Sequence, residues 1–181
     1  MTIAELLLPE FDQEMATTRR TLERVPDDKF AWKPHGKSFS MGDLASHIAN
    51  MVTWTVDTMN RAEFDLAGAT PEQLNRAAKN RAELVSWFDG NVSAARAALD
   101  KPDANYFVPW TLRKGSQVLF TMPRYTCVRS FCLNHIVHHR AQLTVYLRLL
   151  GKKVPSTYGP TADVTWEGAD PTQTVWAASR K

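Results

Sequence analysis

The chain has 181 residues and carries 22 Lys and Arg against 19 Asp and Glu, so its formal net charge is +3. This length predicts one domain that buries enough apolar surface to fold without a disulfide or a metal ion. The small charge excess, spread without blocks of like charge, argues against a nucleic-acid-binding surface. No run approaches the roughly 18 apolar residues that a membrane span requires.

The N-terminus and the two cysteines favour a cytoplasmic protein. The opening residues, MTIAELLLPEFDQE, lack the basic region that begins a secretory signal peptide. Cys127 and Cys132 do not have the C-x-x-C spacing of a redox or zinc motif. On an α-helix their five-residue step turns the side chain by about 140°. We therefore expect two reduced thiols that point apart.

Two amphipathic helices are predicted in the first third of the chain. Apolar residues recur at steps of three and four over residues 7–24, with Pro9 in the early part of that helix. Ser40 and Asp43 have the spacing of a capping box in which aspartate replaces glutamate. A second helix is therefore expected to start there and to continue to about Arg61.

Two further helices are predicted in the rest of the chain. Thr70 is a helix N-cap followed by proline, and the apolar stripe after it continues to Leu99. Residues 101–122 form a long apolar connection, which we expect to pack over one end of the domain and which has room for a short strand pair. The fourth helix is expected over 123–150, with Gly151 as its C-terminal stop.

Four such helices without convincing strand alternation predict an all-α fold, a four-helix bundle. The long connection between helices three and four allows the helices to depart from simple up-and-down order. After Val154 the chain is rich in Pro, Gly and Thr, and we expect it to be an irregular tail on the surface.

Three of the five histidines fall on interior helix faces. His135 and His139 are about 40° apart on the fourth helix, within its apolar stripe, and His47 lies among the apolar residues of the second helix. His138 belongs to the flank of its stripe. Two imidazoles one turn apart and a third from a neighbouring helix can bind one ion and leave coordination positions open, as in catalytic metal sites. Three neutral ligands also favour a lowered pKa of a bound water.

A simpler interpretation stays open. Most i,i+4 histidine pairs are coincidences on a surface, and a buried imidazole can be satisfied by a carbonyl or a hydroxyl. Burying three imidazoles in one bundle without a common partner is costly, however.

The residues around these histidines resemble a known family. The fourth helix reads LNHIVHHRAQL over residues 133–143 and YLRLLGKKVP over 146–155. Together with His47 and the flanking segments, this pattern strongly resembles the DinB family of YfiT-like four-helix proteins. The flanking segments are WKP at 32–34, residues 38–44, MPR at 122–124 and residues 158–163. The resemblance covers roughly residues 9–163, and we divide the chain into a bundle domain over 1–163 and a tail over 164–181.

The resemblance implies a divalent metal ion, commonly zinc or nickel, held by His47, His135 and His139. Ala141 departs from the glycine of many members, but it faces away from the site. Members are often homodimers. Related bundles act as metal-dependent and low-molecular-weight-thiol-dependent transferases or isomerases, which implies a small-molecule substrate, no nucleic acid and no membrane as partners.

Other side chains near the histidines have alternative roles. Cys132 is either an additional metal ligand or, as its residue type favours, a side chain packed in the core. Gln142 either orients an imidazole or makes a packing hydrogen bond. Asp43 is first a helix cap and only then a candidate base. His138 is first a surface residue and only then a substitute for His139, through its i,i+3 spacing from His135. Lys152 and Lys153 are expected to be solvated at the helix end, and three residues could line an entrance: Arg124, Tyr125 and Tyr158.

Three functions follow from these patterns. The first is a metal-dependent enzyme, a hydrolase or a small-thiol-dependent transferase, that activates water or a thiol. The second is a stress-response module that binds a metal or a small ligand without turning it over, since no general base is defined beside the ligands. The third is a purely structural bundle with satisfied histidines.

Overall fold

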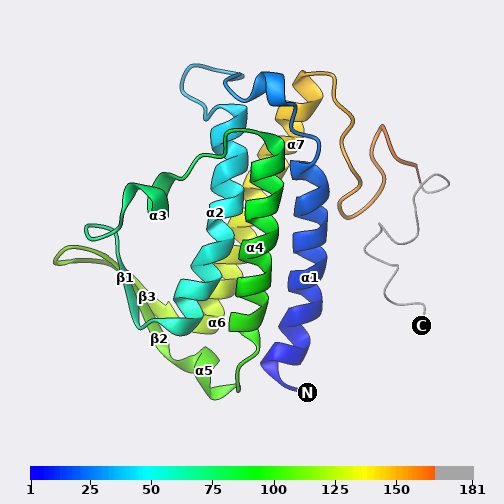
Figure 1. Ribbon diagram of the computed structural model, residues 1–181. Helices are drawn as coiled ribbons and strands as arrows, with labels where there is room; N and C mark the ends of the chain where they lie inside the picture. Colours follow the sequence, from blue (N-terminus) through cyan, green and yellow to red (C-terminus); the bar gives the residue numbers. More distant parts are fainter. Residues whose placement is uncertain (166–181) are drawn as a thin grey trace.

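The computed structural model describes residues 1–165, and in this part the fold is mostly helical with a small sheet on one side (Figure 1). The longest described helical segments are α1 (Ile3–Leu22), α2 (Met41–Asn60), α4 (Arg81–Leu99) and a last segment that ends with α7 (Asn134–Leu149). Both α4 and α7 contact α1 and α2, so the main core lies between these segments. Short helical turns connect them: η1 (Asp27–Lys29), α3 (Pro71–Asn75) and α5 (Ala104–Phe107).

Side-chain caps determine where the long helices begin. The Thr2 side chain and Glu5 form a capping box at the start of α1. At α2 the Ser40 Oγ accepts from the Asp43 backbone N–H at 3.1 Å and donates to the Asp43 carboxylate at 2.7 Å. Asn80 caps α4 in the same manner. The expected cap at Ser40 and the extent of the second helix are confirmed.

The first helix begins earlier than its apolar pattern indicates. The capping box places its start at Ile3 instead of residue 7, so Pro9 lies inside α1 and not in its first turn. Pro9 is exposed, and water can therefore reach the carbonyl that its ring leaves without an N–H donor.

The expected third helix is two helices. α3 ends at Asn75, the chain is extended at Arg76, and α4 starts after the cap at Asn80. The Ala78 backbone N–H donates to Ser46 Oγ at 3.0 Å, which ties the intervening segment to α2. A single helix was the wrong prediction because the apolar stripe continues across the break, whereas the Asn80 cap starts a new helix.

A three-stranded sheet corrects the all-α prediction. The strands are β1 (Glu63–Asp65), β2 (Pro109–Lys114) and β3 (Gln117–Pro123), with β1 parallel and β3 antiparallel to β2. The long connection, which has room for a strand pair, forms β2 and β3, and their turn uses Gly115 at φ +60°. The three residues of β1 carry no detectable alternation, because a strand this short is defined by its pairing.

The last helical segment changes its geometry along its length. It starts with α6 (Arg124–Thr126), continues as a π-helix, η2 (Cys127–Leu133), and becomes α7. Gly151 follows it at φ +66°, as expected of a C-terminal stop. A π-helix bonds residue i to i+5, so residues five apart share a face.

This geometry explains why the prediction that the two thiols point apart is wrong. The Thr58 hydroxyl contacts the Sγ atoms of Cys127 and Cys132 at 3.5 and 3.9 Å. Both cysteines are free thiols and fully buried, as core packing predicts.

A buried ion pair joins α7 to α1. Arg140 is 2% exposed, although the helical pattern places it on the polar side. Its guanidinium donates to the Glu14 carboxylate at 2.7 Å, to Thr18 Oγ1 at 3.1 Å and to the Tyr158 hydroxyl at 2.7 Å. Tyr158 in turn donates to Glu14. The network holds the segment after α7 against α1.

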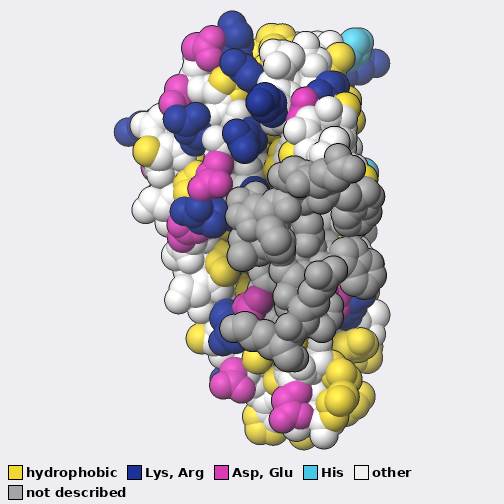
Figure 2. All heavy atoms as spheres, turned by 90° about the vertical axis from the view of Figure 1, so that its right-hand side faces the viewer, with side chains coloured by type: hydrophobic (Ala, Val, Ile, Leu, Met, Phe, Trp, Pro, Cys, Tyr) yellow, Lys and Arg dark blue, Asp and Glu magenta, His cyan; other side chains and the backbone are white. Residues whose placement is uncertain are grey.

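The surface carries charges of both signs. On the face shown in Figure 2, Lys and Arg side chains are interspersed with Asp and Glu. Exposed pairs such as Arg19–Asp89 and Arg96–Asp12 connect α1 with α4. Over residues 1–165, no helix combines the length and the apolar character that a membrane crossing requires. Most of the predicted tail, 164–181, lies outside the described residues.

Replacing Arg140 by alanine should lower the free energy of unfolding by about 3–5 kcal/mol, because the buried Glu14 carboxylate loses its ion-pair partner. Chemical denaturation measures this change. Arg96→Ala, which removes an exposed ion pair, is the matched control and should cost under about 1 kcal/mol. Equal costs for the two variants would contradict the importance of the buried network.

Candidate functional site: a three-histidine cluster

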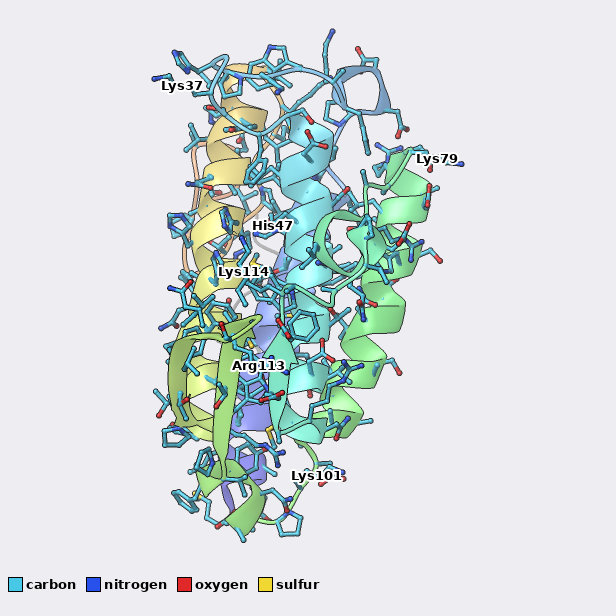
Figure 3. The ribbon with its side chains drawn as sticks, turned by 90° about the vertical axis from the view of Figure 1, so that its left-hand side faces the viewer. Lys37, His47, Lys79, Lys101, Arg113 and Lys114 are labelled. Atoms are coloured by element: carbon cyan, nitrogen blue, oxygen red, sulfur yellow. The ribbon has the colours of Figure 1, made fainter. Side chains whose placement is uncertain are left out.

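The three histidines selected from the sequence come together between α2 and α7. His135 and His139 lie one turn apart on α7, with ring centroids 4.7 Å apart, and the ring of His47 is 4.8 Å from His139 and 5.8 Å from His135. One ligand nitrogen from each residue lies within 4.8 Å of the other two. Figure 3 shows His47 in the space between α2 and α7.

The hydrogen bonds of the two α7 imidazoles direct their Nε2 atoms at each other. The Nδ1–H of His139 donates to the side-chain oxygen of Gln142 at 2.8 Å, which leaves Nε2 as an acceptor. That Nε2 lies 3.0 Å from the Nε2 of His135. The tautomer of His135 decides what its own Nε2 offers at this contact. Either the Nε2–H of His135 donates to His139, or both nitrogens present lone pairs that a cation between them would bind.

All three imidazoles are kept neutral near pH 7. Burial, followed by the neighbouring His139 and His135, lowers the pKa of His47 to about 4. Burial also lowers the pKa of His135, with His139 and His138 adding to the effect. The pKa of His139 is lowered by burial too, against the opposing effect of its hydrogen bond to Gln142. Neutral imidazole is the form that binds a metal ion.

Aromatic rings surround the cluster on one side. Phe39 stacks on His47 at 5.7 Å, and the Trp54 ring lies 5.7 Å from His47 and 5.5 Å from His135. Phe131 stacks on Trp54 at 5.0 Å and lies 5.9 Å from His135. The positions of the histidines alone do not predict these rings. Helical spacing is the signal that could have found two of them, since Trp54 follows His47 by seven residues and Phe131 precedes His135 by four.

The other candidate residues near the histidines are not members of the three-histidine cluster. Gln142 contacts His139, as the orienting role predicts, and its amide nitrogen lies 3.1 Å from His138 Nε2. His138 is exposed and outside the cluster. Asp43 is engaged in the α2 cap, and Cys132 contacts Thr58 in the core.

The three residues suggested for an entrance lie elsewhere. Arg124 donates to the Arg61 carbonyl, Tyr158 belongs to the Arg140 network, and Tyr125 lies with α1 residues in a surface pocket. The exposed positions of Ala141 and of both lysines after α7 agree with the sequence analysis.

Comparisons with known proteins identify what the chain is similar to. A sequence model of the DinB family matches residues 1–170. A DinB-like protein from Bacillus cereus is 20% identical, with a TM-score of 0.68 over 87% of this chain and 98% of that one. A DinB-like protein from Bacillus subtilis is 17% identical, with a TM-score of 0.64 over 84% and 96% of the two chains. At these identities the two structures establish the fold only. No curated protein matches the chain in sequence.

In the metal-free protein, the ring protons of His47 should titrate near pH 4 in an NMR pH series, well below the ordinary value of 6.5. Because the folded state binds this proton more weakly than the unfolded state, stability should be lost as the pH falls from about 6.5 to about 4. A His47 midpoint near 6.5 would contradict the burial of this imidazole in the cluster.

Proposed function

The chain belongs to the DinB family, and from this premise and the three-histidine cluster we propose that it binds a divalent metal ion through His47, His135 and His139. The observation that carries the proposal is the pair of Nε2 atoms 3.0 Å apart on α7. Two ligands about 2.0–2.1 Å from one ion have such a separation when they occupy adjacent positions. His47 completes a face of three nitrogen donors.

The residues around the ligands have distinct tasks in this proposal. Gln142 fixes the tautomer and the orientation of His139 through its Nδ1–H. The Trp54 and Phe131 rings cover one side of the cluster and keep water away there. Three protein ligands leave positions for water or substrate. A divalent ion bound there supplies Lewis acidity and lowers the pKa of a bound water or thiol.

We propose that this site serves a metal-dependent enzyme acting on a small molecule, as a hydrolase or as a transferase that uses a low-molecular-weight thiol. The second candidate is a module that binds a metal or a small ligand without turnover. One observation favours it: within residues 1–165 the cluster contains three histidines and no carboxylate. Asp43, the acid that is a candidate general base, accepts a hydrogen bond from Ser40 in the α2 cap.

Further parts of the proposal complete this picture. Three imidazoles accept zinc, nickel, copper or iron, and we choose zinc or nickel because the resemblance to the DinB family implies them. A cytoplasmic location, a homodimer, a four-helix bundle over residues 1–163 and a separate tail over 164–181 remain predictions, as does the absence of nucleic-acid and membrane partners.

Elemental analysis of the purified protein tests the metal site. Wild type should hold one zinc or nickel ion per chain, and His139→Ala should lose it because two imidazoles remain. His138→Ala is the matched control, since it removes the neighbouring imidazole outside the cluster, and it should retain the ion. A metal-free wild type that also fails to take up zinc or nickel on titration would refute the proposal.

Replacing Gln142 by alanine should weaken metal affinity by about 10–100-fold, because His139 loses the acceptor that fixes its tautomer. Competition with a chromophoric chelator measures the affinity. Thr144→Ala, which removes a nearby α7 hydroxyl that donates to the Ala141 carbonyl, provides the control and should leave affinity unchanged. Unchanged affinity in Gln142→Ala would show that the hydrogen bond does not support the site.

A further inference from the structure

A cavity of about 490 Å³ lies beside the histidine cluster, between α2, the α3 segment, α4 and the sheet. Its volume is within the range of about 300–1,000 Å³ that small-molecule sites occupy. Five aromatic rings dominate its wall: Trp54, Phe64, Trp87, Trp110 and Phe131. We call it the aromatic cavity. The histidines are not among its lining residues, so it is distinct from the proposed metal site.

The aromatic cavity and the cluster share one layer of rings. Trp54 and Phe131 line the cavity, stack on each other at 5.0 Å and contact His135 at 5.5 and 5.9 Å. A molecule in the cavity would therefore lie across a single ring layer from the three imidazoles.

The α3 segment forms part of the wall of the aromatic cavity. Gln73 and Leu74 of α3 contribute to the lining. Asn50 of α2 donates to the Gln73 carbonyl at 3.0 Å, and the Ala78–Ser46 hydrogen bond holds the chain just beyond. These two hydrogen bonds thus hold the segment that carries Leu74 in the wall of the cavity.

One buried polar group in the wall has no partner. Trp110 is 2% exposed, and within residues 1–165 no protein atom accepts a hydrogen bond from its Nε1–H. Leaving a buried donor unpaired is costly, and buried indoles usually find an acceptor. A ligand with a hydrogen-bond acceptor would remove this cost.

The charges of the lining disfavour an anionic ligand. Asp57 and Glu72 line the cavity together with one cation, Arg76. The Arg76 guanidinium already lies 4.4 Å over the Trp87 ring and 3.6 Å from Glu83, so it is not free for an anion. Asp57 pairs with Arg61 at 3.0 Å.

From the aromatic wall, the unpaired indole N–H and the excess of carboxylates, we propose that the aromatic cavity binds an uncharged aromatic small molecule that carries a hydrogen-bond acceptor. Aromatic walls bury such a ring through apolar contact and ring stacking. The site is separate from the metal ligands and is expected to bind with or without a metal ion.

Fluorescence titration with prodan, an uncharged naphthyl ketone, tests this site. Wild type should bind prodan with a blue-shifted emission and should bind the anionic anilinonaphthalene sulfonate at least tenfold more weakly. Thr53→Phe, which adds a ring at a lining position of α2, should weaken prodan binding at least tenfold and leave the metal content unchanged. Ala94→Phe, which adds the same ring at an exposed position of α4, is the matched control and should bind as wild type.

Trp110→Phe examines the indole N–H while keeping a ring in the wall. This variant should bind prodan several-fold more weakly. Its free energy of unfolding should not decrease, because the Trp110 N–H has no acceptor within residues 1–165 of the free protein and no hydrogen bond is lost. His139→Ala should bind prodan as wild type does, which separates this site from the metal site. Absence of prodan binding by wild type, or equal binding by wild type and Thr53→Phe, would overturn the proposal.

Discussion

Two imidazoles that face each other one turn apart on α7 set the constraint that the rest of the site satisfies. Their Nε2 atoms are 3.0 Å apart, and the opposite side of the His139 ring is engaged by Gln142. Two neutral imidazoles in this position either share one hydrogen bond, with His135 as its donor, or present two lone pairs to one cation. His47 adds a third donor from α2, and the burial that lowers the pKa of all three keeps them in the form that binds a cation.

The irregular parts of the fold shape the surroundings of these imidazoles. The π-helical turn η2 carries Phe131, whose ring contacts both His135 and Trp54. The sheet packs against the same turn, because Trp110 and Leu112 of β2 form a second small core with Cys127 of η2. The sheet and the turn together thus enclose an apolar space next to the cluster.

The sequence predicts those features that depend on regular α-helical geometry and on the residue types that begin and end a helix. The three interior histidines, the cap at Ser40 and the stop at Gly151 follow from spacing alone, and the structure places all of them as expected. The failures occur where local geometry departs from a uniform α-helix or where distant residues decide. The two cysteines share a face only because η2 is a π-helix, Arg140 is buried only because Glu14 of α1 neutralises it, and β1 exists only through its pairing with β2.

The central claim is that one divalent ion binds to the three imidazoles. X-ray absorption spectroscopy of the zinc-loaded protein tests it most directly, because the scattering identifies the ligand type and its distance. We predict three imidazole nitrogens at about 2.0–2.1 Å with the remaining coordination supplied by oxygen. A sulfur ligand at about 2.3 Å, or fewer than three imidazoles, would contradict the assignment of His47, His135 and His139 as the metal ligands.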